Sequence, residues 1–236
     1  MTFPTFNDLK KNLKKDTGAF PLLKIALLGD SATQFLSLAI KGMGVEEGYR
    51  IDLYEADYNQ IEQQFMDKSS GLYGFNPDYI VVFHSARKLL QHYNELPTSE
   101  QSQLAEQRLD FIRFIAGSVT CKVIYYNYPE IDDSVFGSYS VKVESSFLFQ
   151  IRKLNYELML LSQTFPNFFV CDIASLQNTC GRDMMFSPSL YVNADLVLSL
   201  EILPRVAMLT LSIVEALAGK FKKCLIVDLD NTLWGG

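Results

Sequence analysis

The chain has 236 residues, of which 48% are hydrophobic, so it is long enough to bury one sizeable core or two small ones. Its net charge of −6 at pH 7 argues against a nucleic-acid-binding surface, because such surfaces carry clustered Lys and Arg. No apolar run approaches the length of a membrane span, and the N-terminus lacks the basic start and apolar stretch of a secretory signal.

Four cysteines are present, and their spacing is not that of a zinc site. Cys121, Cys171 and Cys224 each begin or end an apolar run, which is typical of small core residues in a reducing compartment. The sequence therefore predicts a cytoplasmic protein without zinc and without a disulfide framework.

Short apolar runs alternate with amphipathic stretches along the chain. A short helix is expected first, over 5–13, with Thr5 as its N-cap and Asp8 in its first turn. The buried strands expected after it, in chain order, are 22–28, 49–55, 78–83, 122–126 and 167–170. The expected helices are 36–43, 57–66, 86–93, 97–116 (opened by a capping-box pattern), 145–164 and 196–217, with loops at 69–77 and 177–191 and an irregular stretch at 130–143.

Strands that alternate with helices predict an α/β fold, a doubly wound parallel sheet with helices on both faces. We expect three parts: a helical lead-in over 1–19, the α/β domain over 20–219, and a separate segment over 220–236. The apolar run 223–228 follows a long helix and the Gly219 stop, so its strand is expected to lie in a different sheet from the first five.

The last segment carries the strongest chemical pattern. The apolar run Cys224–Val227 is followed by Asp228, Asp230 and Thr232. Two carboxylates crowded at a strand end repel each other unless a cation or a shared proton compensates. Mg²⁺ suits such a site because it prefers hard oxygen ligands. One carboxylate can attack phosphorus while the other moves a proton to the leaving group.

This segment resembles motif I of the haloacid dehalogenase (HAD) superfamily, Asp-x-Asp-x-Thr after a hydrophobic strand. With Leu233-Trp-Gly-Gly236 attached, it is similar to the FkbH-like branch of HAD phosphatases. The resemblance implies that Asp228 is the aspartyl nucleophile and Asp230 the general acid/base, that both hold Mg²⁺, and that Thr232 helps to bind substrate. It further implies a phosphatase or phosphotransferase acting on a phosphorylated small molecule, in some members with an acyl carrier protein as partner.

The position of the motif bears on what the chain can do alone. The resemblance implies that the motif is the first strand of a HAD Rossmann-like domain, whose further Ser or Thr, Lys and acidic pair are not found before Gly236. We therefore expect the rest of the HAD domain to follow Gly236 in a longer protein. The 236-residue chain alone is expected to have no phosphatase activity and to bind no Mg²⁺ at this motif.

A second group of polar residues directly follows the other strands, and its members are Asp30 and Ser31, His84 and Ser85, Asn127, and Asp172. Ligands of open parallel sheets bind outside the carboxyl ends of the strands. If the strand order is flavodoxin-like, the third strand lies beside the first, which places His84 about 5 Å from the turn of Ser31.

The residues Ile25 to Ser31, Ile-Ala-Leu-Leu-Gly-Asp-Ser, resemble the first block of the SGNH (GDSL-like) hydrolases, in which the Ser after Gly-Asp is the nucleophile. FkbH-like proteins often carry such a domain before their HAD domain, so the two resemblances agree. The SGNH resemblance implies Asn127 as an oxyanion donor. SGNH enzymes take their base from a late Asp-x-x-His, whereas the late region from Asp183 contains no His, which leaves His84 as a displaced base.

Each of these residues also has a purely structural interpretation: Ser31 as the N-cap of the first helix, His84 as a partner of buried backbone groups, Asn127 as a turn residue and Asp172 as a helix cap. Three hypotheses follow. The first is the N-terminal module of an FkbH-like HAD protein without esterase activity of its own. The second is a serine esterase or acyltransferase that uses Ser31 with His84, and the third is an interaction module.

Overall fold

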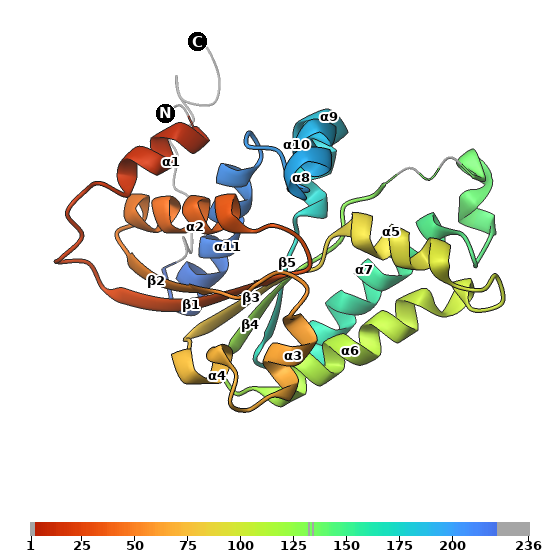
Figure 1. The fold of residues 1–236 in the computed structure, drawn as a ribbon, viewed down its shortest axis with the longest axis horizontal. Helices are drawn as coiled ribbons and strands as arrows, with labels where there is room; N and C mark the ends of the chain where they lie inside the picture. Colours follow the sequence, from red (N-terminus) through yellow and green to blue (C-terminus); the bar gives the residue numbers. More distant parts are fainter. Residues whose placement is uncertain (1–2, 132, 134, 221–236) are drawn as a thin grey trace, which may run out of the picture.

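The computed structural model describes residues 3–131, 133 and 135–220. Its centre is a parallel sheet of five strands in the order β2-β1-β3-β4-β5 (Figure 1). The strands are β1 (Leu22–Gly29), β2 (Arg50–Glu55), β3 (Tyr79–Phe83), β4 (Lys122–Tyr126) and β5 (Phe168–Cys171). This confirms the doubly wound α/β fold and places the third strand beside the first.

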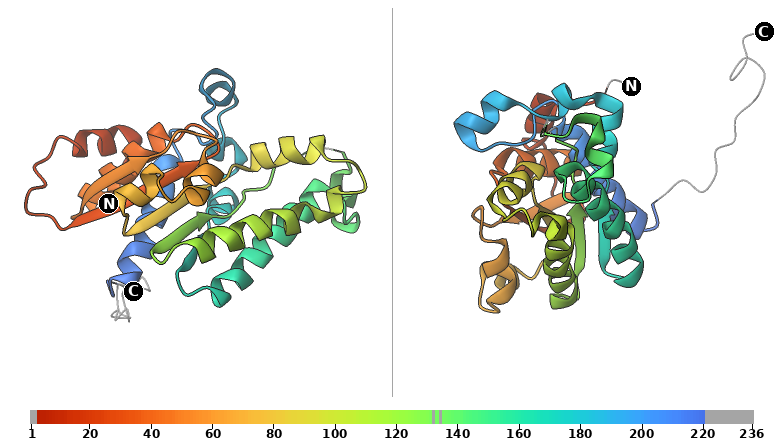
Figure 2. Two further views of the ribbon diagram at one scale, coloured as in Figure 1. Left: turned by 60° about the horizontal axis from the view of Figure 1, so that its bottom comes forward. Right: turned by 90° about the vertical axis from the view of Figure 1, so that its right-hand side faces the viewer.

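Helices cover both faces of the sheet (Figure 1). One face packs against α1 (Phe6–Asn12), α2 (Gln34–Glu46), α8 (Ala174–Cys180), α9 (Arg182–Met185) and α11 (Leu203–Leu217). The other face packs against α3 (Ile61–Met66), α4 (Gly71–Phe75), α5 (Ala86–Glu95), α6 (Leu104–Ser118) and α7 (Phe147–Thr164). Figure 2 shows α6 and α7 side by side along their face.

The central strands β1, β3 and β4 are nearly continuous apolar runs, apart from Lys24 in β1 and Lys122 at the start of β4, because both of their sides are covered. In β1, Ala26 and Leu28 belong to the core under α3–α7, whereas Ile25 and Leu27 belong to the core under α1, α2 and α11. All four side chains are fully buried. The alternation follows from the pleat, which sends successive side chains to opposite faces.

The lead-in helix α1 is packed on the domain. Thr5 is the predicted N-cap, and with Asp8 it forms a capping box, since each side chain accepts the backbone N–H of the other at 3.2 Å. The fully buried Leu9 lies against Gly42 of α2, so closely that a Cβ atom on Gly42 would meet the Leu9 carbonyl oxygen at 2.4 Å. The lead-in is therefore held by close helix–helix packing.

Two predicted loops contain helices. The stretch 69–77 holds α4, because Gln64 of α3 accepts the Leu72 N–H at its side-chain oxygen and Leu72 is buried. The stretch 177–191 holds most of α8, all of α9 and the start of α10 (Pro188–Ala194). Ser187 is the N-cap of α10 and Pro188 is its first residue, which is a local sequence signal for a helix start. The loop prediction rested on the polar composition of the stretch and missed this signal.

Three predicted helix starts were too early. The helix expected from 57 begins at Ile61, and that expected from 196 begins at Leu203 after an extended stretch in which Leu198 bridges Phe186. The helix expected from 97 begins at Leu104, after a 3₁₀ turn η1 (Gln101–Gln103). Its first turn takes a cap from α7, where Gln150 accepts the Ala105 N–H at 3.0 Å, in place of the predicted capping box. A second 3₁₀ segment, η2 (Gly137–Lys142), lies in the stretch expected to be irregular.

The segment 221–236 lies outside the described residues, so the boundary at 220 and the separate sheet for 223–228 stay predictions. Within the described part of the chain, no helix combines the length and the apolar character needed to cross a bilayer. Cys121, Cys171 and Cys180 are free thiols.

Candidate functional site

The carboxyl ends of β1 and β3 meet where the strand order reverses, which is the usual ligand position in such sheets. The Asp30 N–H donates to the Phe83 carbonyl at 3.2 Å. The Ser85 N–H donates to both carboxylate oxygens of Asp30, at 3.0 and 2.9 Å. The turns after the two strands are thus bonded to each other, as the strand order requires.

The pleat decides which of the turn residues shares a cavity with His84. Asp30 continues the series of Ala26 and Leu28, which face α3–α7, and it lines a cavity of about 200 Å³ together with His84. Ser31 does not line this cavity. The other lining residues are Asn59, Ile61, Glu62, Lys88, Arg108 and Phe111.

His84 is buried, and its Nδ1 atom is hydrogen-bonded to the Tyr125 hydroxyl at 2.8 Å. The Tyr125 hydroxyl is in turn 2.5 Å from the hydroxyl of Tyr128. Burial, reinforced by the positive charge of Arg108, holds the pKa of His84 well below its usual range. The imidazole is therefore neutral, and its partner is a tyrosine side chain, not the buried backbone that the structural interpretation predicted.

Ser31 is fully buried, and its Oγ atom has no hydrogen-bond partner among the described residues. It is not the N-cap of α2, because that position is Thr33. In the described part of the chain, no hydrogen bond joins the side chains of Ser31 and His84. The structure therefore places Ser31 and His84 on adjoining turns without bringing their side chains into hydrogen-bonding contact.

The turn of Ser31 is contacted by Asp195, whereas the late region expected from the SGNH resemblance begins at Asp183. The Ala32 N–H donates to the Asp195 carbonyl at 3.1 Å, whereas Asp183 is exposed. Counting Asp-x-x-His from Asp195 puts the buried Leu198 at the histidine position. No His stands three residues after either Asp183 or Asp195.

Asn127 joins the end of β4 to the start of α8. Its side-chain amide donates to Asp172 at 2.7 Å, and its side-chain oxygen accepts the Ala174 N–H at 2.9 Å. Asp172 also accepts the Ser175 N–H at 3.1 Å, so it bonds to the first turn of α8, although the N-cap residue of that helix is Ile173 and not the predicted Asp172. In this state the Asn127 amide is engaged in cross-linking the strand end.

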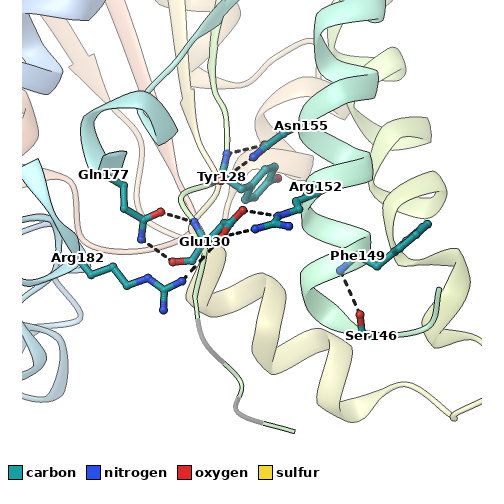
Figure 3. Close-up of polar contacts among 8 residues, drawn as sticks. All are labelled: Tyr128, Glu130, Ser146, Phe149, Arg152, Asn155, Gln177 and Arg182. Atoms are coloured by element: carbon teal, nitrogen blue, oxygen red, sulfur yellow. Dashed lines mark hydrogen bonds and ion pairs between the residues drawn. The ribbon is translucent and has the colours of Figure 1, made fainter. Parts of the chain in front are cut away.

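The chain beyond β4 is held by two helices (Figure 3). Asn155 of α7 accepts the Tyr128 N–H at 2.9 Å and donates to the Tyr128 carbonyl at 2.7 Å. Gln177 of α8 makes the same reciprocal pair with the Glu130 backbone, and Arg152 forms an ion pair with the Glu130 carboxylate at 2.6 Å. These contacts fix the position of Tyr128, whose hydroxyl is the last group in the series of hydrogen bonds that runs from His84 through Tyr125.

Sequence reasoning missed Arg108. It lies on α6 three residues after the buried Ala105 and four before the buried Ile112, so a charged residue stands on the core-facing stripe. That helical spacing was the available signal. Asp30 was noted only as part of the strand-end turn, because its burial depends on α5 and α6.

The predicted HAD residues Asp228, Asp230 and Thr232 lie outside the described residues. Among the residues that are described, no three His, Cys, Asp or Glu side chains gather as a metal-binding group.

A family model described as "FkbH, N-terminal domain" matches residues 24–215. The chain belongs to this family. No curated protein matches it. Among solved structures, the N-terminal part of the protein BF1531 from Bacteroides fragilis, containing a phosphatase domain and complexed with Mg, is 52% identical with a TM-score of 0.95. The match covers 99% of this chain and 62% of that one, so the chain spans less than two thirds of this relative.

Two more distant structures share the fold of this FkbH N-terminal domain. A lipase/acylhydrolase from Enterococcus faecalis is 18% identical with a TM-score of 0.54, over 86% of this chain and all of that one. A family 3 carbohydrate esterase from Clostridium thermocellum is 17% identical with a TM-score of 0.51, over 84% of this chain and all of that one. They support the SGNH-like fold and, at this identity, nothing finer.

Proposed function

We propose that the protein containing this chain is a Mg²⁺-dependent phosphatase or phosphotransferase of the HAD type, with its chemistry at Asp228 and Asp230. The observation that carries the proposal is the 52% identity with a longer protein that contains a phosphatase domain and binds Mg. The 99% coverage must reach into the motif, since residues 1–222 alone would be about 94% of 236.

The proposed reaction divides the work between the two carboxylates. The Asp228 carboxylate attacks the phosphorus of a phosphomonoester, while Asp230 gives a proton to the departing alcohol oxygen. Asp230 then takes a proton from the water that attacks the aspartyl phosphate, which releases phosphate and restores Asp228. Both donors are hard oxygens of the kind Mg²⁺ prefers, and the bound ion would neutralise phosphoryl charge beside Thr232.

The substrate in this proposal is a phosphorylated small molecule, and an acyl carrier protein is a proposed acceptor or partner. The test uses the full-length protein with a generic phosphomonoester and Mg²⁺. Asp228→Asn should lower phosphate release by about three orders of magnitude or more, as loss of a nucleophile does. The control is Asp183→Asn, an exposed carboxylate of the described domain, which should leave the rate unchanged. Unchanged release by Asp228→Asn would reject the proposal.

The described domain is proposed to have no esterase activity of its own. The supporting observation is that Ser31 Oγ has no hydrogen-bonded base among the described residues, and that Leu198 stands at the late histidine position. A serine hydroxyl without a base is a poor nucleophile at neutral pH.

The alternative, a serine esterase or acyltransferase that uses Ser31 with His84, has a direct assay. The 236-residue chain is incubated with a short-chain ester, alongside Ser31→Ala, His84→Ala and, as a control, the exposed Ser138→Ala. We expect no hydrolysis above background. Hydrolysis that is lost in both Ser31→Ala and His84→Ala, and kept in Ser138→Ala, would establish the alternative.

A further inference from the structure

Two neighbouring cavities open at the carboxyl edge of the sheet, on the side of α3, α5 and α6. The cavity beside Asp30 and His84 has a volume of about 200 Å³, and the one next to it about 300 Å³. They share Glu62, Arg108 and Phe111 in their walls. Together they have the size of a small-molecule site, at the position where open α/β sheets bind ligands.

Arg108 is half-buried between the two cavities. Within the described ranges it makes no hydrogen bond, and no carboxylate lies within ion-pair distance of it. By contrast Arg113, one turn further along the same helix, pairs with Glu106 and Asp110 at 2.8 Å each. A guanidinium carries five N–H donors, and leaving them without acceptors in a partly desolvated site is costly.

The other groups of the cavity leave Arg108 free to take an anion. Both oxygens of Asp30 are engaged by the Ser85 N–H, and Lys88 lies 3.6 Å from Asp195. His84 is bonded to Tyr125 and is neutral. Glu62 is an exposed side chain at the rim.

The last wall is apolar. The Phe111 ring lies edge-on to the ring of His84, with ring centroids 5.8 Å apart, and lines both cavities. A ligand whose charged end reaches Arg108 therefore meets an aromatic surface beside it, which suits a short carbon skeleton.

We propose that this cavity binds a small organic anion, with a carboxylate or phosphate group on Arg108 and a short carbon chain against Phe111. Arg fits this role because its planar fork matches both oxyanions with two parallel hydrogen bonds. The site is separate in the sequence from Asp228 and Asp230, so it goes beyond the proposed phosphate chemistry. It gives the SGNH-like domain a binding role that needs neither Ser31 nor a catalytic base.

The test is a ¹H–¹⁵N NMR titration of the 236-residue chain with inorganic phosphate, acetate and butyrate at constant ionic strength. Shifts of the Ser85, Arg108 and Phe111 amides should saturate with at least one probe. The probe that binds more tightly, phosphate or acetate, identifies the charged group, and tighter binding of butyrate than of acetate reports the Phe111 contact. Arg108→Leu should weaken the Kd by about tenfold or more, while the matched control Arg113→Leu leaves it unchanged.

A second variant removes a negative charge instead of a positive one. Glu62 is exposed, so Glu62→Gln should not disturb folding. It should lower the Kd by roughly twofold to fivefold, because the repulsion between the Glu62 carboxylate and the bound anion is lost. If Arg108→Leu does not fold, Arg108→Lys takes its place and should still weaken binding, because the fork is lost. No saturable shift with any probe, equal binding by the Arg108 variant, or weaker binding by Glu62→Gln would each overturn the proposal. Asp228→Asn should bind as the unaltered chain does, which keeps this test independent of the phosphatase proposal.

Discussion

Asp30 accepts the Ser85 N–H with both of its carboxylate oxygens, and this pair locks the turn after β1 to the turn after β3. The carboxyl group is buried, and burial raises its pKa from 3.8 to about 7, against the opposing pull of the Ser85 N–H and the charge of Arg108. The cavity edge thus contains an acid that changes its charge near neutral pH.

This shift predicts a pH-dependent stability. In the unfolded chain the carboxyl ionises near pH 3.8 and in the folded chain near 7, so the folded state binds more protons in between. The stability contribution of Asp30 is therefore full below about pH 4 and is lost as the pH rises to 7. The Asn side chain of Asp30→Asn can still accept the Ser85 N–H but does not ionise. The free energy of unfolding of this variant, relative to that of the unaltered chain, should therefore be higher at pH 8 than at pH 5 by about 2 kcal/mol.

The measurement for Asp30→Asn is urea unfolding at the two pH values, with the exposed Asp183→Asn as control. The charges around Asp30 are Lys88, Arg108 and the rim carboxylate Glu62, with Tyr125 and Tyr128 protonated throughout this range. A stability difference that is the same at both pH values would contradict the assigned shift.

Asn127 is expected to act in stability. Asn127→Ala removes the bond to Asp172 and leaves the Ala174 N–H without its acceptor, so the free energy of unfolding should fall by about 2 kcal/mol. Asn178→Ala, at an exposed position of α8, should change it by less than about 0.5 kcal/mol. Denaturant melts of both variants decide the matter, and equal stability of the two would refute a cross-linking role for Asn127.

Gly42 tests the packing of the lead-in helix. A Cβ atom there would stand 2.4 Å from the Leu9 carbonyl oxygen and 2.7 Å from the Leu9 Cβ, which forces α1 away from α2. Gly42→Ala should therefore destabilise the chain by about 1–3 kcal/mol, despite the better helix propensity of Ala. Gly74→Ala is the matched control, because nothing lies within 4 Å of its added Cβ. The measurement is the melting temperature of each variant. A higher melting temperature for Gly42→Ala than for Gly74→Ala would disprove the tight contact.

Several features were readable from sequence because they depend on neighbours along the chain. Apolar runs bounded by turns predict the five strands, and their lack of alternation predicts a sheet covered on both sides. The Thr5 cap of α1 is a local pattern as well, and so is the start of α7 at one of two adjacent serines, of which Ser146 is the cap and accepts the Phe149 N–H at 3.2 Å (Figure 3). The family was likewise predicted from a few adjacent residues, whereas the role of Asp228 stays a prediction.

Other features depend on contacts between distant segments, and only the tertiary structure decided them. Gln64 turns a Gly- and Ser-rich stretch into α4, and Gln150 sets the start of α6, each from another helix. Asp195, not Asp183, reaches the turn of Ser31 because the path of the chain through α10 brings it there. The pleat of β1 decides the face of the sheet on which Asp30 lies. Asp30 lines a cavity with His84 and Arg108 only because α5 and α6 cover that face.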